Sequence, residues 1–140
     1  MGGFRVDGLS ALSDSLDKMA AMPDDVMGAM LREGADVLAK AQQESADAFG
    51  LWDTGMMIES IKSGKARRTP DGGDISITPE GTRRRGKTTT RNAEIAYVNE
   101  YGKEGQPGTG FISKANFEHG PDAIAASDKV YQNWLDKIGL

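Results

Sequence analysis

The sequence predicts an α+β domain, in which a long N-terminal helix and a C-terminal helix pack on a small antiparallel β-sheet with a long basic loop. Two observations lead to this fold class. Apolar residues recur at helical spacing near both ends of the chain, whereas residues 62–91 are polar, alternate in hydropathy and contain turn sequences. The chain has 140 residues, which suits one domain with a modest core, so residues 1–140 are expected to form a single unit.

The N-terminal segment, residues 1–22, is expected to form a first amphipathic helix. Asp7 can accept hydrogen bonds from the free N–H groups at its start. Four apolar side chains then recur at spacings of three and four residues and would share one helical face: Leu9, Leu12, Leu16 and Met19.

A longer helix is predicted from Pro23 to about Gly50. Proline fits the first turn of a helix, Asp24 and Asp25 would lie near the positive end of its dipole, and glycine is a suitable terminator. The predicted helix has about 27 residues and is about 40 Å long, since the rise is 1.5 Å per residue. Gly34 and several alanines narrow its apolar stripe, which indicates that another segment packs closely against it.

After this helix the chain is expected to turn into the sheet. Asp53 or Thr54 can cap a short helical turn with Met57 on its apolar side. A strand through residues 60–68 then leads to the turn sequence TPDGGD, which predicts a β-hairpin about residues 71–73.

Basic residues are concentrated in the middle of the chain. Residues 62–91 contain nine basic and three acidic residues, a net charge of +6, whereas the rest contains eight basic and eighteen acidic residues, a net charge of −10. Within this stretch we expect a basic loop at 80–92, with a strand near 87–91. Its candidate contact residues are Arg83, Arg84, Arg85, Lys87 and Arg91.

This loop allows two interpretations. It is either a solvated loop without a partner or a contact for an anionic partner. Three adjacent arginines repel one another, which is a reason to expect an anion beside them. The partner would be the phosphates of DNA or the acidic side chains of a neighbouring subunit. No aromatic residue lies within the loop, which argues against stacking on single-stranded bases.

The sharpest enzymatic signal is the Asp-Thr-Gly triplet at 53–55. Dimeric aspartic proteases build a pair of carboxylates that share one proton from one such triplet per chain. Here a long predicted helix precedes the triplet and Met56 follows it, which favours a capping role for Asp53. His119 has no neighbouring metal-type ligands, and the glycines of 102–110 lack the pattern of a phosphate-binding loop. We therefore expect no catalytic, cofactor-binding or metal site.

The C-terminal part is expected to change direction twice, at the glycine-rich stretch 102–110 and at Gly120–Pro121. Residues 93–101 form a short predicted helix that ends at Gly102. The glycine-rich stretch 102–110 then makes a corner, and Phe111 returns to the core. The following sequence FISKANFE is helical in character, and Gly120–Pro121 is expected to break it and to start the last helix.

Two stretches in this order, DTGMMIESIK and IAYVNEYGKEGQPGTGFISKANFE, resemble signatures of the neck and tail-completion proteins of tailed bacteriophages, also described as head–tail joining or minor capsid proteins. In that family a short aromatic helix ends in glutamate–aromatic–glycine, and a polar corner and a phenylalanine follow. The family often has arginine–proline before the phenylalanine and a proline after it, and both are missing here. The resemblance rests on Asp53, Thr54, Gly55, Glu100, Tyr101, Gly102 and Phe111.

The resemblance implies an α+β subunit of a homo-oligomeric ring at the head–tail connection of a virion, without catalysis. Its partners would be further copies of itself, other head–tail connector or tail-tube proteins, and passing double-stranded DNA, which it would contact without sequence preference. The ring would be assembled in the bacterial host cytoplasm. No apolar run approaches the roughly 20 residues of a membrane span, so no membrane partner is expected. Two alternatives stay open, a nucleic-acid-binding module that uses the basic loop and the dimeric aspartic protease.

Overall fold

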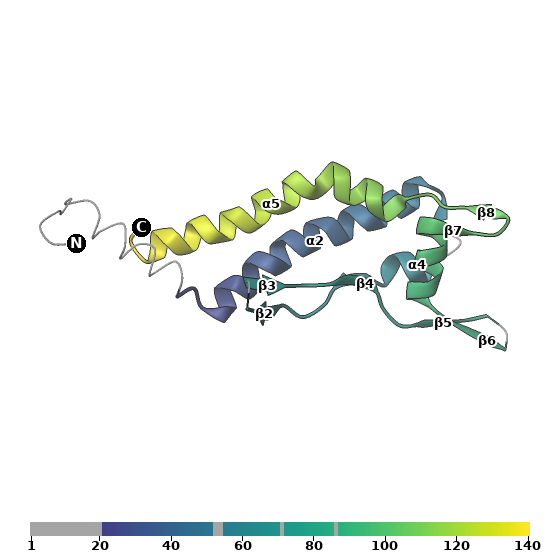
Figure 1. Ribbon diagram of the computed structural model, residues 1–140, viewed down its shortest axis with the longest axis horizontal. Helices are drawn as coiled ribbons and strands as arrows, with labels where there is room; N and C mark the ends of the chain where they lie inside the picture. Colours follow the sequence, from purple (N-terminus) through teal and green to yellow (C-terminus); the bar gives the residue numbers. More distant parts are fainter. Residues whose placement is uncertain (1–20, 52–54, 71, 86) are drawn as a thin grey trace, which may run out of the picture.

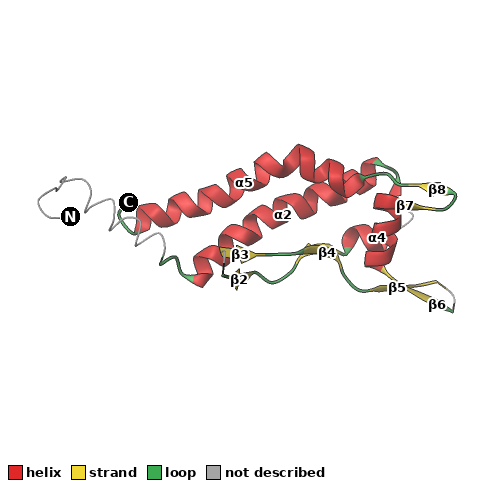
Figure 2. Cartoon of the chain, in the orientation of Figure 1, coloured by secondary structure: helices red, strands yellow, loops and turns green. Residues whose placement is uncertain are grey.

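The computed structural model describes residues 21–51, 55–70, 72–85 and 87–140. Two long helices, α2 (Asp24–Ala48) and α5 (Phe111–Lys137), lie side by side along its long axis (Figure 1). Short strands lie along one side of α2, and α4 (Asn92–Tyr101) lies at one end of the molecule beside two hairpins (Figure 2). The α+β class predicted from the sequence is therefore confirmed.

Two predicted features fall on residues that the structure does not describe. The first helix, expected within 1–22, lies almost entirely outside the described residues, and so do the capping residues Asp53 and Thr54. These expectations stay predictions.

Helix α2 begins and ends close to where its sequence predicts. Pro23 is the N-cap residue, with extended backbone angles (φ −65°, ψ 153°), and Asp24 and Asp25 occupy the first turn near the positive end of the dipole. Phe49 is the C-cap residue, and Gly50 follows with a φ of 75°, a conformation that glycine adopts without steric cost.

Small and polar residues line the seam between α2 and α5. A Cβ atom on Gly34 would lie 3.2 Å from the Ala123 carbonyl oxygen, so the two backbones approach each other closely here, as the narrow stripe on α2 predicts. Two side-chain hydrogen bonds fix the register of the helices: Gln42 Nε2 to Asn116 Oδ1 at 3.0 Å, and Ser45 Oγ to the Phe111 carbonyl at 2.8 Å.

Helix α5 is continuous, so the break predicted at Gly120–Pro121 is wrong. Pro121 lies inside the helix, where it lacks the N–H group that would bond to the carbonyl four residues earlier. Ala115 and Ala123, on either side of the proline, are both buried. Packing on both sides thus outweighs the local cost of the proline, and the helix is bowed in its N-terminal half rather than broken (Figure 1).

The strands form separate antiparallel pairs rather than one continuous sheet. Strand β1 (Ile61–Ser63) pairs with β4 (Ile77–Pro79), and β2 (Arg67–Thr69) pairs with β3 (Gly72–Asp74). The second pair confirms the hairpin predicted about residues 71–73.

Two ion pairs hold the β2–β3 hairpin. Arg67 Nε donates a hydrogen bond to Asp74 Oδ1 at 3.1 Å, and this bond and the carboxylate charge raise the pKa of Arg67. Arg68 pairs with Asp24 and also donates to the Met22 carbonyl at 2.8 Å, which ties the hairpin to the start of α2. Both pairs are exposed, so each contributes little to stability.

The region predicted as a basic loop at 80–92 is instead a β-hairpin. Strand β5 (Thr82–Arg85) pairs with β6 (Thr88–Arg91), so the expected strand near 87–91 is present and its partner was missed. Each of the three arginines of β5 lies opposite a threonine of β6. Threonine favours strands, and this register keeps like charges from facing each other across the pair.

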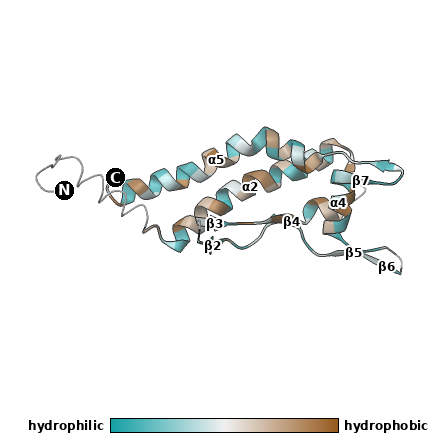
Figure 3. Cartoon of the chain, viewed as in Figure 1, coloured by the Kyte–Doolittle hydropathy of each residue, from teal (hydrophilic) through white to brown (hydrophobic). Residues whose placement is uncertain are grey.

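The hydrophobic core is small and lies where α2, α3 (Gly55–Glu59), α4 and the start of α5 meet. Its largest fully buried side chains are Phe111, Met57 and Ile61, each of which contributes about 1.5–3 kcal/mol through burial. The other buried apolar residues among those described are alanines: Ala35, Ala39, Ala41, Ala46, Ala96, Ala115 and Ala123. Hydrophobic segments nevertheless recur along α2, α4 and α5 (Figure 3).

Candidate functional site

A tight corner joins α4 to α5. Gly102 follows α4 with a φ of 86° and a ψ of 177°, a conformation essentially restricted to glycine. The chain then forms the two-residue strands β7 (Gly102–Lys103) and β8 (Gln106–Pro107). A Cβ atom on Gly102 would lie 2.6 Å from the Gly108 nitrogen, and one on Gly108 would lie 2.5 Å from the Glu100 carbonyl oxygen. The two sides of the corner are thus in backbone contact that leaves no room for a side chain.

The Glu100 carboxylate caps the N-terminus of α5. Its Oε2 accepts a hydrogen bond from the Ile112 N–H at 2.7 Å, and its Oε1 accepts from the Ser113 N–H at 3.1 Å and from the Ser113 hydroxyl. The N-cap residue itself, Gly110, has no side chain that could do this. Glu100 therefore supplies the missing cap from another helix and places its charge at the positive end of the α5 dipole.

Further hydrogen bonds close the corner. The Thr109 N–H and hydroxyl both donate to the Asn99 carbonyl, at 2.7 and 2.8 Å, and the Gly110 N–H donates to the Glu100 carbonyl at 3.1 Å. Phe111 then enters the core and is fully buried. As the sequence predicts, Gly102 ends α4, and Phe111 anchors the start of α5 in the core.

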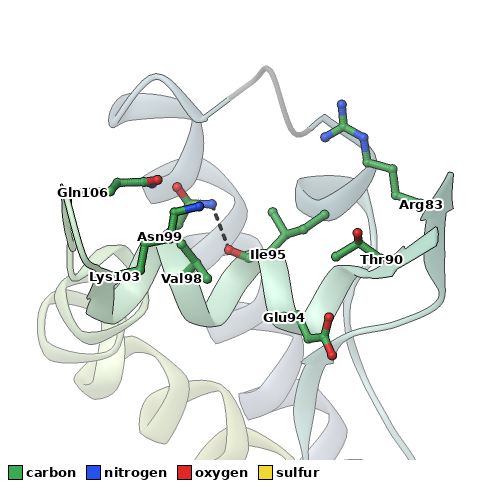
Figure 4. Close-up of a pocket in the computed structure, with 8 residues that line it drawn as sticks. All are labelled: Arg83, Thr90, Glu94, Ile95, Val98, Asn99, Lys103 and Gln106. Carbon is green, nitrogen blue, oxygen red and sulfur yellow. Dashed lines mark hydrogen bonds between the residues drawn. The ribbon is translucent and has the colours of Figure 1, made fainter. Parts of the chain in front are cut away.

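A shallow groove runs along the exposed side of α4 (Figure 4). Its volume is about 500 Å³. Ile95 and Val98 give it an apolar floor, Arg83 lies at one end, and Lys103 and Gln106 lie at the other. The lining residues come from α4 and both flanking hairpins: Arg83, Thr90, Glu94, Ile95, Val98, Asn99, Lys103 and Gln106.

Two exposed tyrosines extend this apolar surface. Tyr97 and Tyr101 are 62% and 69% exposed, and their ring centroids lie 4.8 Å apart. Residues three and four positions apart are neighbours on a helix, so Tyr101 adjoins Val98 of the groove. We call Ile95, Tyr97, Val98 and Tyr101 the α4 face.

A second apolar surface lies on α5. Phe117 is 87% exposed and Ile124 is 71% exposed. Seven residues separate them, which places them on the same side of the helix two turns apart, and Pro121 is exposed between them. We call Phe117, Pro121 and Ile124 the α5 ridge.

The β5–β6 hairpin carries the basic residues expected to make contacts. At its base the Asn92 N–H donates to the Gly81 carbonyl at 3.0 Å, and Asn92 Nδ2 donates to the Glu80 carbonyl at 2.8 Å. Arg83 borders the groove. The side chain of Arg85 is outside the described structure. The three other basic residues of the hairpin are exposed: Arg84, Lys87 and Arg91.

No cluster of metal ligands is found among the described residues. They contain no group of three or more His, Cys, Asp and Glu side chains that could hold a metal ion. His119 Nδ1 lies 3.2 Å from Asp122 Oδ2 on the surface of α5. Within the same residues, no helix is long and apolar enough to cross a membrane.

The sequence interpretation missed the surface residues of α4 and α5. It singled out Tyr101 but not Tyr97 or Phe117, and it placed Ile124 on the apolar stripe of the last helix, whereas Ile124 is 71% exposed. The available signal was the helical spacing of these large apolar residues, four positions between Tyr97 and Tyr101 and seven between Phe117 and Ile124.

Comparison with protein-family models, with curated proteins and with solved structures gives no match. The resemblance to the phage neck and tail-completion proteins therefore rests on the two motifs and on the order of the elements.

Proposed function

We propose that this protein is a structural subunit of a virion, and that copies of it form a ring at the head–tail connection of a tailed phage. The subunit acts through its shape and contacts: copies pack on one another, DNA passes through the centre, and no covalent bond is made or broken. Other connector or tail-tube proteins stack on the ring. The ring assembles in the bacterial host cytoplasm and stays in the neck or tail of the virion.

Apolar surface left outside the fold carries this proposal. The core consists largely of alanines, whereas four large side chains on α4 and α5 are between 62% and 87% exposed: Tyr97, Tyr101, Phe117 and Ile124. Large apolar and aromatic side chains gathered on a surface mark contacts between proteins. This distribution favours a subunit that buries these exposed apolar side chains when it assembles with other copies.

The charge distribution supports contacts between identical copies. Helices α2 and α5 together contain ten acidic and five basic residues, whereas residues 82–91 contain five basic and no acidic residues. A chain that carries both signs on separate surfaces can place the basic hairpin of one copy against the helices of the next.

The corner favours a structural role for the second motif. A catalytic carboxylate must reach a substrate, but Glu100 is 7% exposed and both of its oxygens are bonded to the start of α5. Gly102 is held by backbone contact, and Phe111 is in the core. The motif residues thus join two helices in a fixed arrangement, which is what a ring subunit requires.

Sedimentation velocity of the purified protein tests the proposal. A defined oligomer is expected at high protein concentration and low ionic strength, and it should dissociate as salt screens the charged contacts. A chain that sediments as a monomer under all of these conditions would contradict the proposal.

The β5–β6 hairpin also favours a second candidate, a nucleic-acid-binding module. Its five basic residues are not balanced by any acidic residue of the same hairpin. This candidate predicts that the monomer binds double-stranded DNA, with an affinity that falls steeply with salt. Fluorescence anisotropy with labelled DNA distinguishes the two, because the ring proposal requires no tight binding by the monomer.

A further inference from the structure

We infer that the α4 face of one subunit receives the α5 ridge of a second copy of this chain, in a head-to-tail contact. The inference rests on the proposed function and deepens it, because it names the two surfaces through which one subunit holds the next.

Both surfaces are largely apolar, and of the residues that define them only Ile95 packs partly against the core of its own subunit. Helix α4 turns Ala96, Asn99 and Glu100 inward, so its other side is free to bind. Helix α5 turns Ala115 and Ala123 inward. Apart from Ile95, the side chains of the ridge and of the α4 face do not cover the core and are available to another chain.

The two surfaces differ in form, so that one can receive the other. The α4 face includes a groove of about 500 Å³ with an apolar floor. The α5 ridge projects two large side chains, Phe117 and Ile124, about 10.5 Å apart along the helix. The phenyl ring is 87% exposed and is the natural anchor for the groove, because a large side chain that fills a pocket on its partner supplies much of the binding free energy.

Their charges are complementary. Residues 115–128, which contain the ridge, include three acidic residues and no lysine or arginine: Glu118, Asp122 and Asp128. Asp122 is paired with His119, and the other two are exposed. Arg83 and Lys103 lie at opposite ends of the groove, with Glu94 as its one acidic lining residue. Opposite charges at the rim of a contact fix its register and accelerate association.

The same charges disfavour the symmetric alternatives. A contact between two ridges would bring acidic residues together, and a contact between two α4 faces would bring two basic hairpins together. Like charges across an interface are destabilising. When two copies meet through unlike surfaces, each copy still has one of the two surfaces free, so further copies can add in the same way. The assembly closes into a ring when the rotation between neighbouring copies allows it.

Directed crosslinking tests the inference, because the chain contains no cysteine. Tyr97→Cys marks the α4 face, Ile124→Cys marks the α5 ridge, and a short flexible bismaleimide joins cysteines that lie close together. We expect the doubly substituted chain to give a ladder of covalent dimers, trimers and larger species. An equimolar mixture of the two singly substituted chains should give dimers alone, and each of these chains by itself should stay monomeric.

A matched control places the second cysteine elsewhere. Pro70 is exposed and lies between β2 and β3, at the opposite end of α2 from α4 (Figure 1), so the combination of Pro70→Cys with Ile124→Cys should give no ladder. Dimers from either singly substituted chain alone would overturn the inference, because they require a symmetric contact. A ladder from the control pair as strong as from the test pair would also overturn it.

A substitution gives an independent measurement. Phe117→Ser should weaken association at least tenfold in sedimentation, while the unfolding midpoint of the monomer changes little because the side chain is 87% exposed. An unchanged association constant would contradict the inference.

Failure of the inference and failure of the proposed function give different results. Rings that form without the expected crosslinks would overturn the inference alone. A crosslinked ladder from open filaments would support the inference and overturn the ring. A monomer that neither associates nor crosslinks would overturn both.

Discussion

At the scale of single residues, the corner between α4 and α5 depends on one buried carboxylate. Glu100→Gln should lower the free energy of unfolding by about 1–2 kcal/mol, because the amide loses the charge at the helix terminus and can accept fewer of the bonds from Ile112 and Ser113. Urea unfolding measures this. Glu104→Gln, at an exposed turn position, is the control and should have almost no effect. Equal effects of the two substitutions would contradict the capping role.

Two glycines of the corner differ in how strongly the fold constrains them. Gly102 and Gly105 have similar φ angles of 86° and 79°, but only Gly102 is crowded, by the backbone of residues 106–108. Gly105→Ala should destabilise by about 1–2 kcal/mol, which is the cost of a left-handed residue with a side chain. Gly102→Ala adds a steric clash and a ψ of 177° that a residue with a side chain does not tolerate at this φ, so it should cost clearly more, and Gly102→Val more again.

Thermal unfolding of these variants, monitored by circular dichroism, checks the order. A Gly102→Val chain as stable as the natural one would show that the corner is not held as described.

The sequence revealed part of this corner. Gly102 and Phe111 could be predicted, because a glycine after a helix and an apolar residue after a polar turn are local signals. The role of Glu100 could not be predicted, since its bonds reach residues 12 and 13 positions away. Those bonds depend on how the corner folds back, which local patterns do not contain.

At the scale of elements, α5 contains a glycine directly before its internal proline. Gly120 lies inside the helix, where the Pro121 ring disfavours helical backbone for a preceding residue that has a Cβ atom, so Gly120→Ala should not give the gain of about 0.5–1 kcal/mol that this change brings elsewhere in a helix. Chemical denaturation of the monomer tests this.

Gly34 is the contrasting position. A Cβ atom there would press on the Ala123 carbonyl, so Gly34→Leu should force α2 and α5 apart and cost about 1–3 kcal/mol or more. If this substitution were harmless, the close approach of the two helices would be wrong.

Element boundaries were predictable where local signals and packing agree. Helix α2 has an acidic first turn and a glycine after its end, and its observed limits follow them. Pro121 misled the prediction, because contacts of α5 on both sides of it outweigh a single lost hydrogen bond. Strand β5 was missed because three consecutive arginines resemble a solvated loop, and its pairing with β6 becomes visible only in the fold.

At the scale of the whole molecule, the basic hairpin is expected to contribute to assembly. Arg83→Ala, Arg84→Ala and Arg85→Ala combined should weaken oligomerisation and reduce its salt dependence, since three charges at the contact are removed. Sedimentation at several salt concentrations measures both quantities. The control is Arg67→Ala, whose exposed pair with Asp74 lies on the separate β2–β3 hairpin. Intact assembly of the triple variant, in solution and in the virion, would contradict this role.

The exposed apolar surface could not be predicted from composition alone. The chain is 38% hydrophobic, an ordinary value that gives no indication of how much of this content reaches the core. In the fold, α2 and α5 meet through small residues, so the large side chains of the α5 ridge remain outside. Whether an apolar residue packs inside its own chain is a property of the assembled helices.

Negative-stain electron microscopy of the purified protein tests the central claim most directly. The proposed function predicts closed rings of uniform diameter with a central channel wide enough for double-stranded DNA, and the Phe117→Ser chain should lose them. Images that show single elongated subunits, or open filaments without closure, at protein concentrations where sedimentation detects association would contradict it.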